Sequence, residues 1–204
     1  MNQVCIKCEK RRARRHCPGI GADICPQCCG EERENTIDCP LDCEFLRDAR
    51  RHERPPELTE KDFPNLDIRV NDDFLEKHER EVLTMSLALK LVMEREKAVD
   101  SDAREALEAM VKTYRTLNSG LIYESRPQNP YAAAIQDELT QTIERMRKAM
   151  AEEAGMETLR DADVLGALVF LERLQIQHNN RRRRGRAFLD FLRTYFPEPK
   201  KVQA

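Results

Sequence analysis

Three short stretches decide the fold of the N-terminal part: CIKC at residues 5–8, CPQCC at 25–29 and CPLDC at 39–43. With Cys17 they hold all eight cysteines of the 204-residue chain. Two cysteines separated by two residues can present both thiolates to one ion from a single tight turn. The extra residue in 39–43 suits a turn that runs into a helix. Eight thiolates are enough for two four-cysteine zinc sites, and the candidate ligands are Cys5, Cys8, Cys17, Cys25, Cys28, Cys29, Cys39 and Cys43.

The spacing of the cysteines does not decide which of them share an ion. We favour an interleaved arrangement, in which one ion is held by Cys5, Cys8, Cys39 and Cys43. The second ion would take Cys17, Cys25 and Cys28, with Cys29 as the candidate fourth ligand. Because adjacent residues project in different directions, Cys28 and Cys29 can serve different ions, or one of them can be spare. His16 and His52 are possible substitutes, so the ligand set stays open.

Metal binding also answers a folding problem. A segment of this size with few large apolar residues cannot build its own core, and a structural zinc site supplies on the order of 10 kcal/mol of folding free energy. Three other interpretations compete: disulfides, an iron–sulfur cluster, and a redox pair at Cys25 and Cys28. The redox motif needs a strand and a helix around it, which the sequence does not suggest. A set made only of cysteines argues against catalytic zinc.

The spacing Cys5-x2-Cys8, Cys25-x2-Cys28 and Cys39-x3-Cys43, followed by a helix, resembles the interleaved treble-clef fingers of the HIT and MYND type. The resemblance covers about a quarter of the chain. The closing His-x3-Cys pair of those fingers is missing, and Cys17 falls outside their spacing. Those fingers typically bind other proteins, so the resemblance implies binding rather than catalysis.

The composition is typical of long, solvated helices, with 35% charged residues, 5% aromatic residues and no Trp. A formal net charge of -2 gives no overall attraction to nucleic acid or anionic lipid. No apolar run approaches the roughly 20 residues that span a bilayer, and the basic N-terminus lacks the apolar region of a secretory signal. We therefore expect a cytoplasmic protein without a membrane partner.

The distribution of proline and of apolar residues predicts a zinc-binding module at 1–52, an extended linker at 53–72, an antiparallel bundle of about five helices at 73–197 and a tail at 198–204. Apolar residues recur every three or four positions in each expected helix. Asp72 or Asp73, then Asp102, are the expected N-caps of the first two helices. Asn129 with Pro130, and Gly155, are expected to begin and end the third. The most apolar helix, from about residue 161 to 176, should lie nearest the bundle centre.

Two basic runs are the remaining features. Arg11, Arg12, Arg14 and Arg15 lie in the first cysteine loop, and Arg181, Arg182, Arg183 and Arg184 precede the last helix. Positive charge at a helix N-terminus opposes the helix dipole, so something should offset it. The arginines either contact nucleic-acid phosphates or pair with carboxylates of the chain itself. Neither run contains an aromatic residue that could stack on a base.

The leading hypothesis is a non-enzymatic adaptor, in which a zinc finger tethered to a helical bundle binds another protein. The alternative is nucleic-acid binding through the two arginine runs. No nucleophile or acid–base motif and no small-molecule substrate is evident, so an enzyme is a distant third. His78, on an apolar helix face, is expected to be a packed residue rather than a ligand.

Overall fold

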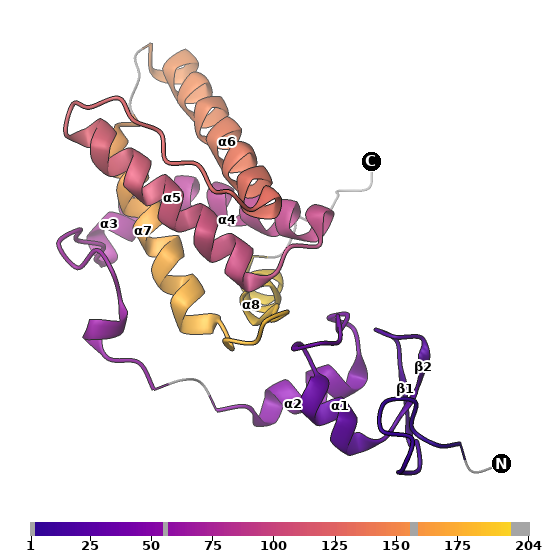
Figure 1. Cartoon of the computed structure of the whole chain (residues 1–204). Helices are drawn as coiled ribbons and strands as arrows, with labels where there is room; N and C mark the ends of the chain where they lie inside the picture. Colours follow the sequence, from indigo (N-terminus) through magenta and orange to yellow (C-terminus); the bar gives the residue numbers. More distant parts are fainter. Residues whose placement is uncertain (1–2, 55–56, 156–158, 197–204) are drawn as a thin grey trace, which may run out of the picture.

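The computed structural model describes residues 3–54, 57–155 and 159–196. Within these residues the chain is mainly α, as the sequence predicts, with eight α-helices and one two-stranded sheet. Figure 1 shows a small cysteine-rich module at one end of the molecule and a helical bundle at the other. None of the helices in the described ranges is both long enough and apolar enough to span a membrane.

The cysteine-rich module, residues 3–52, contains the sheet and two helices. Strands β1 (Arg15–Cys17) and β2 (Ala22–Ile24) pair antiparallel, with His16 opposite Asp23. Helix α1 (Pro26–Glu32) follows β2 directly, and α2 (Glu44–His52) closes the module. Its small core contains the cysteines and only three fully buried large apolar side chains, Ile24, Ile37 and Leu46. So small a core is typical of a module that needs metal or disulfides to fold.

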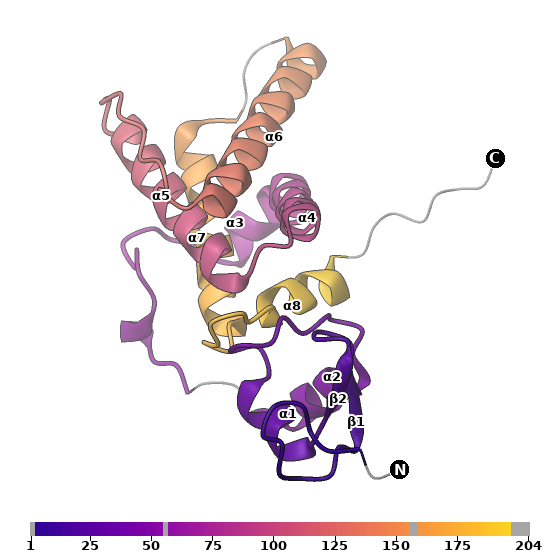
Figure 2. The same ribbon diagram turned by 45° about the vertical axis from the view of Figure 1, so that its right-hand side comes forward.

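A short 3-10 helix, η1 (Glu60–Asp62), lies between the module and the bundle. The bundle contains α3 (Asp72–Lys77), α4 (Glu79–Glu96), α5 (Asp100–Asn118), α6 (Pro130–Ala154), α7 (Asp161–His178) and α8 (Ala187–Tyr195). Helix α5 packs most extensively on α7, and α4 packs on α6. In Figure 2, α8 lies between the other bundle helices and the cysteine-rich module.

The expected first helix is divided in two. His78 ends α3 and begins α4, with φ -115° and ψ 24°. The break places the imidazole in the interior, against the Phe74 ring and 3.5 Å from a carboxylate oxygen of Asp163. His78 is buried, as expected for a packed residue.

Two of the predicted N-caps are wrong by one to three residues. Asn71, rather than an aspartate, caps α3, since its Oδ1 accepts the N–H of Phe74 at 3.1 Å. Helix α5 begins at Asp100, so Asp102 lies inside its first turn and accepts the N–H of Val99 at 2.8 Å. An aspartate is a good residue in either place, because its carboxylate can reach free N–H groups from both.

The predicted ends of α6 are confirmed. Asn129 accepts the N–H of Tyr131 at 3.0 Å, with Pro130 as the first helical residue. Gly155 ends the helix with φ 71°, a left-handed conformation that glycine adopts without steric cost. The prediction for α7 also holds, because most of its apolar side chains are buried in the bundle core.

Glu34 joins the cysteine-rich module to the bundle. Its side chain is completely buried, and its carboxylate accepts hydrogen bonds from Arg50 Nη2 at 2.6 Å, Asn180 Nδ2 at 2.8 Å and the backbone N–H of Arg186 at 3.0 Å. Its carbonyl oxygen accepts the N–H of Arg184 at 2.7 Å. A buried carboxylate is tolerated only with such partners, so this contact fixes the module against the segment before α8.

Candidate metal centre

Four cysteines form one compact cluster. The sulfur atoms of Cys5, Cys8, Cys25 and Cys28 all lie within 4.8 Å of one another. Three of these residues are buried and Cys8 is half-buried. Four thiolates at such separations can surround a single ion that prefers sulfur ligands and tetrahedral geometry.

Local backbone structure positions each pair. In the first, the N–H of Glu9 donates to the carbonyl of Cys5 at 2.8 Å, which closes a tight turn around Cys8. In the second, Cys25 is the N-cap of α1, and its Sγ accepts the N–H of Cys28 at 3.4 Å. Strand β2 delivers Cys25 to this position, and Pro26 suits the first helical residue.

The thiols of this cluster differ in their pKa values. Burial opposes the thiolate of Cys5, but backbone N–H groups, first that of Cys25, outweigh it and lower the pKa of Cys5 to about 6. A hydrogen bond with Cys25, followed by burial, raises the pKa of Cys28 to about 12. Metal ligation requires thiolates, so a bound cation would displace the remaining protons.

The expected pairing of cysteines is wrong. Cys5 and Cys8 lie with Cys25 and Cys28, not with the 39–43 pair. The reason is the chain path: the β1–β2 hairpin folds back, so that the N–H of Ile6 donates to the carbonyl of Asp23 at 3.2 Å. This contact places the start of α1 beside the first cysteine turn.

The other four cysteines are separate from this cluster. They line one small cavity, with apolar side chains between them, and are Cys17, Cys29, Cys39 and Cys43. Burial, followed by the neighbouring Cys17, Glu34 and Cys43, raises the pKa of Cys39 to about 11. In the described residues no three of these sulfurs lie within 4.8 Å of one another.

The two candidate histidine ligands do not join any cluster of potential ligands among the described residues. His16 is exposed and lies 3.0 Å from a carboxylate oxygen of Asp23, its cross-strand partner. His52 is exposed at the C-terminal end of α2. All eight cysteines are free of disulfides.

A strand and a helix do flank Cys25 and Cys28, contrary to the expectation from the sequence. Strand β2 ends at Ile24 and α1 begins at Pro26, which is the local setting that a redox Cys-x-x-Cys pair requires. The sulfurs of Cys5 and Cys8 beside this pair complete a four-sulfur set instead. A metal centre therefore explains why four sulfurs lie together, whereas a redox dithiol would need only two of them.

The arginines of the second run have different environments. Arg182 donates to the carbonyl of Arg33 and to Glu53, both at 2.9 Å. Arg181, Arg183 and Arg184 have exposed side chains. Arg182 therefore holds the cysteine-rich module, while the other three present charge to solvent.

Arg186, just beyond this run, is buried and binds the module and the bundle together. Its guanidinium donates to the carbonyls of Ala98 at 3.1 Å and Lys97 at 2.8 Å and forms an ion pair with Asp38. In the sequence Arg186 is one more residue of a basic run at the start of the last helix, and no pattern there predicts that it is buried.

A buried carboxylate, that of Asp100, lies at the start of α8. It accepts the N–H groups of Phe188 at 3.0 Å and Leu189 at 3.4 Å. Burial raises the pKa of Asp100 to about 7, against the lowering effect of these two N–H groups. The sequence missed this role, because Asp100 lies 88 residues before its partner.

In the first basic run, two arginines contact the cysteines. Arg11 Nη1 lies 4.0 Å from Cys25 Sγ, and Arg15 Nη1 lies 3.4 Å from Cys29 Sγ. Arg12 and Arg14 form no ion pair with any described residue. The eight arginines of the two runs therefore do not form one uniform surface.

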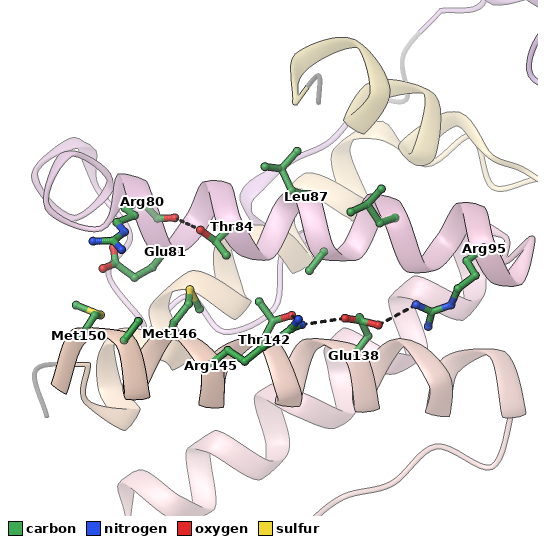
Figure 3. A pocket seen from close by; sticks show the side chains of 13 residues that line it. Arg80, Glu81, Thr84, Leu87, Arg95, Glu138, Thr142, Arg145, Met146 and Met150 are labelled. Carbon is green, nitrogen blue, oxygen red and sulfur yellow. Dashed lines mark hydrogen bonds and ion pairs between the residues drawn. The ribbon is translucent and has the colours of Figure 1, made fainter. Parts of the chain in front are cut away.

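Two larger hollows lie on the bundle. A groove of about 520 Å³ runs between α4 and α6, over Leu91 and Met146. Figure 3 shows Glu138 at this groove, where it accepts hydrogen bonds from Arg95 at 2.9 Å and Arg145 at 3.0 Å. The charges there are neutralised within the chain.

The second hollow, of about 620 Å³, lies between the start of α5 and residues 179–183. It is lined by four arginines, together with Asp62 and neutral side chains; the arginines are Arg104, Arg181, Arg182 and Arg183. Positive charge therefore exceeds negative charge in its lining.

No protein-family model, curated protein or solved structure matches this chain. The likeness to HIT and MYND fingers therefore rests on cysteine spacing alone.

Proposed function

We propose that this protein is a non-enzymatic adaptor whose cysteine-rich module is stabilised by zinc and binds another protein. The observation that carries the proposal is the closed cluster of Cys5, Cys8, Cys25 and Cys28. Four protein ligands fill a tetrahedral zinc shell and leave no position for a substrate or an activated water. The metal then serves to fold the module, and the module's surface serves the function.

Zinc fits this cluster better than an iron–sulfur centre does. Four sulfurs within 4.8 Å of one another surround one ion closely. A multi-iron cluster holds its cysteine sulfurs farther apart, because iron and sulfide lie between them. With eight cysteines in the module, we expect two zinc ions for each chain. Metal analysis of the purified protein tests this, and iron with visible colour would contradict it.

The surface proposed for the partner lies beside the first cysteine turn. Val4 and Ile6 are 56% and 58% exposed and give this part of the module a small apolar surface. Lys10, Arg12 and Arg14 follow them in the sequence and form no ion pair with any described residue, and Arg12 lies opposite Val4 in an isolated β-bridge. An apolar anchor with a cationic rim suits an acidic protein segment that carries an apolar side chain.

A pair of matched variants tests this surface. Tagged protein captures partners from a cell extract, and Val4→Asp with Ile6→Asp should reduce the specific capture to background. The control is Leu121→Asp with Ile122→Asp, because these residues are also exposed but lie on the bundle. Zinc content must be equal in both variants. Equal capture by the two variants would show that this surface of the module does not bind the partner.

Nucleic-acid binding is the second candidate, favoured by the four-arginine lining of the hollow beside α5. Phosphate contacts from Arg181 and Arg183 in this hollow, and from the exposed Arg184 that follows them in the sequence, would make the affinity fall steeply with salt. Changing these three residues to Ala, and leaving Arg182 to hold the module, should abolish the binding and its salt dependence. Unchanged binding to short RNA and DNA strands would exclude this surface.

A further inference from the structure

The small cavity lined by Cys17, Cys29, Cys39 and Cys43 is the feature that extends the proposed function furthest. Its volume is about 10 Å³, roughly the space of one water-sized sphere. We propose that this cavity is a second zinc site, formed by Cys17, Cys29, Cys39 and Cys43. This inference rests on the proposed function, because it assumes that the module folds around metal, but it assigns residues that the first cluster does not use.

Four different elements bring these cysteines together. Cys17 ends β1, Cys29 lies in α1, Cys39 lies in the loop before α2, and Cys43 is the N-cap of α2. The Cys43 side chain makes no capping hydrogen bond, so its sulfur is not engaged at the helix start. A metal at this position would join β1, α1 and the start of α2.

The neighbouring cysteines of α1 explain how the module can hold two ions. Successive residues of a helix project about 100° apart. Cys28 faces the first cluster, whereas Cys29 faces the second cavity. The pair therefore divides between two sites, which was one of the alternatives that the sequence left open.

The charges around Cys29 supply an independent argument. Arg15 Nη1 and Arg33 Nη2 lie 3.4 Å and 4.0 Å from its sulfur. Arg15 also stacks over the Phe45 ring, with its guanidinium carbon 4.5 Å from the ring centre. A neutral buried thiol needs no cation beside it. Zinc with four thiolates carries two negative charges, and donors of this kind orient and stabilise such ligands.

The four sulfurs are farther apart than a bound zinc ion would hold them, so binding requires a structural change. Zinc–sulfur bonds of about 2.3 Å place tetrahedral sulfurs about 3.8 Å apart, whereas no three of these four lie within 4.8 Å of one another. The ion would draw the four sulfurs toward the cavity. At least two of the four sulfurs would therefore move toward each other on binding.

The test begins with the native chain, purified under reducing conditions and loaded with cadmium in place of zinc. Two cadmium NMR resonances in the four-thiolate range are expected. Cys17→Ser with Cys39→Ser should lose one resonance, and Cys5→Ser with Cys25→Ser should lose the other. A single resonance from the native chain would overturn the second site and leave the first intact. No resonance at all would instead overturn the zinc-stabilised function.

A milder variant covers the case in which the double serine variants do not fold. Arg33→Gln removes one cation from Cys29 without removing a ligand, so one of the two ions should pass to a chelator about 10- to 100-fold more readily. Arg47→Gln is the control, because Arg47 is exposed on α2. Equal metal transfer from both variants would contradict the role of Arg33 at a second site.

Discussion

The carboxylate of Glu34 accepts a hydrogen bond from the backbone N–H of Arg186 at 3.0 Å, across 152 positions of sequence. Arg186 is the N-cap of α8, so the carboxylate of Glu34, a residue of the cysteine-rich module, lies at the positive end of a bundle helix. The module is therefore docked on the bundle through a buried, charged contact. This contact holds the surface of the module in one orientation relative to the bundle.

Replacing Glu34 should destabilise the protein strongly. In Glu34→Ala the guanidinium of Arg50, which lies 2.6 Å from the carboxylate, loses a buried partner. Removing one member of a buried ion pair costs about 3–5 kcal/mol, and Glu34→Gln should cost less because it keeps the shape. Urea denaturation measures both values. Glu76→Gln, on an exposed position of α3, is the control, and an equal effect there would contradict a docking role.

Asp100 should make stability depend on pH. Burial raises its pKa in the folded state to about 7, from an ordinary value of 3.8. The folded state therefore binds the proton more tightly, so this group favours folding when protonated and opposes it as the pH rises toward 7. The effect is at most on the order of 4 kcal/mol, at about 1.4 kcal/mol for each pKa unit.

The variant Asp100→Asn isolates this effect from the other titrating groups. Its stability relative to the native chain should increase between pH 5 and pH 8, because only the native chain has to ionise a buried carboxyl group. Urea titrations at several pH values measure the difference. A difference that stays constant with pH would show that Asp100 does not carry the dependence.

A side chain at Gly166 should destabilise the protein. A Cβ at this position of α7 would lie 2.7 Å from Cε2 of the Phe74 ring, so Gly166→Ala should cost about 1–3 kcal/mol through overpacking. Gly30→Ala in α1, where a Cβ meets nothing within 4 Å, should be neutral or stabilising by up to about 1 kcal/mol. Combining Gly166→Ala with Phe74→Leu should cost less than the sum of the two. Additive costs would exclude the clash.

The sequence patterns predicted those features, such as helix positions and helix ends, that depend on residues close together in the chain. The apolar period gave the bundle helices, and Asn129 and Gly155 marked the ends of α6, because caps act within a few residues. The cysteine pairing depends on how β2 folds back onto the first turn, which no spacing encodes. Glu34 and Asp100 find partners 152 and 88 residues away. Neither acid carries a local pattern that separates it from the other carboxylates of the chain.

Removing the metal should unfold the cysteine-rich module and spare the bundle. The module buries few large apolar residues of its own, whereas the bundle has a separate, larger core around α7. A strong chelator with reductant should therefore abolish the helices α1 and α2 but keep most of the far-ultraviolet helical signal. Amide hydrogen exchange should show Ile24 and Leu46 losing protection while Leu168 keeps it. Collapse of the whole helical signal would mean that the bundle cannot fold without the docked module.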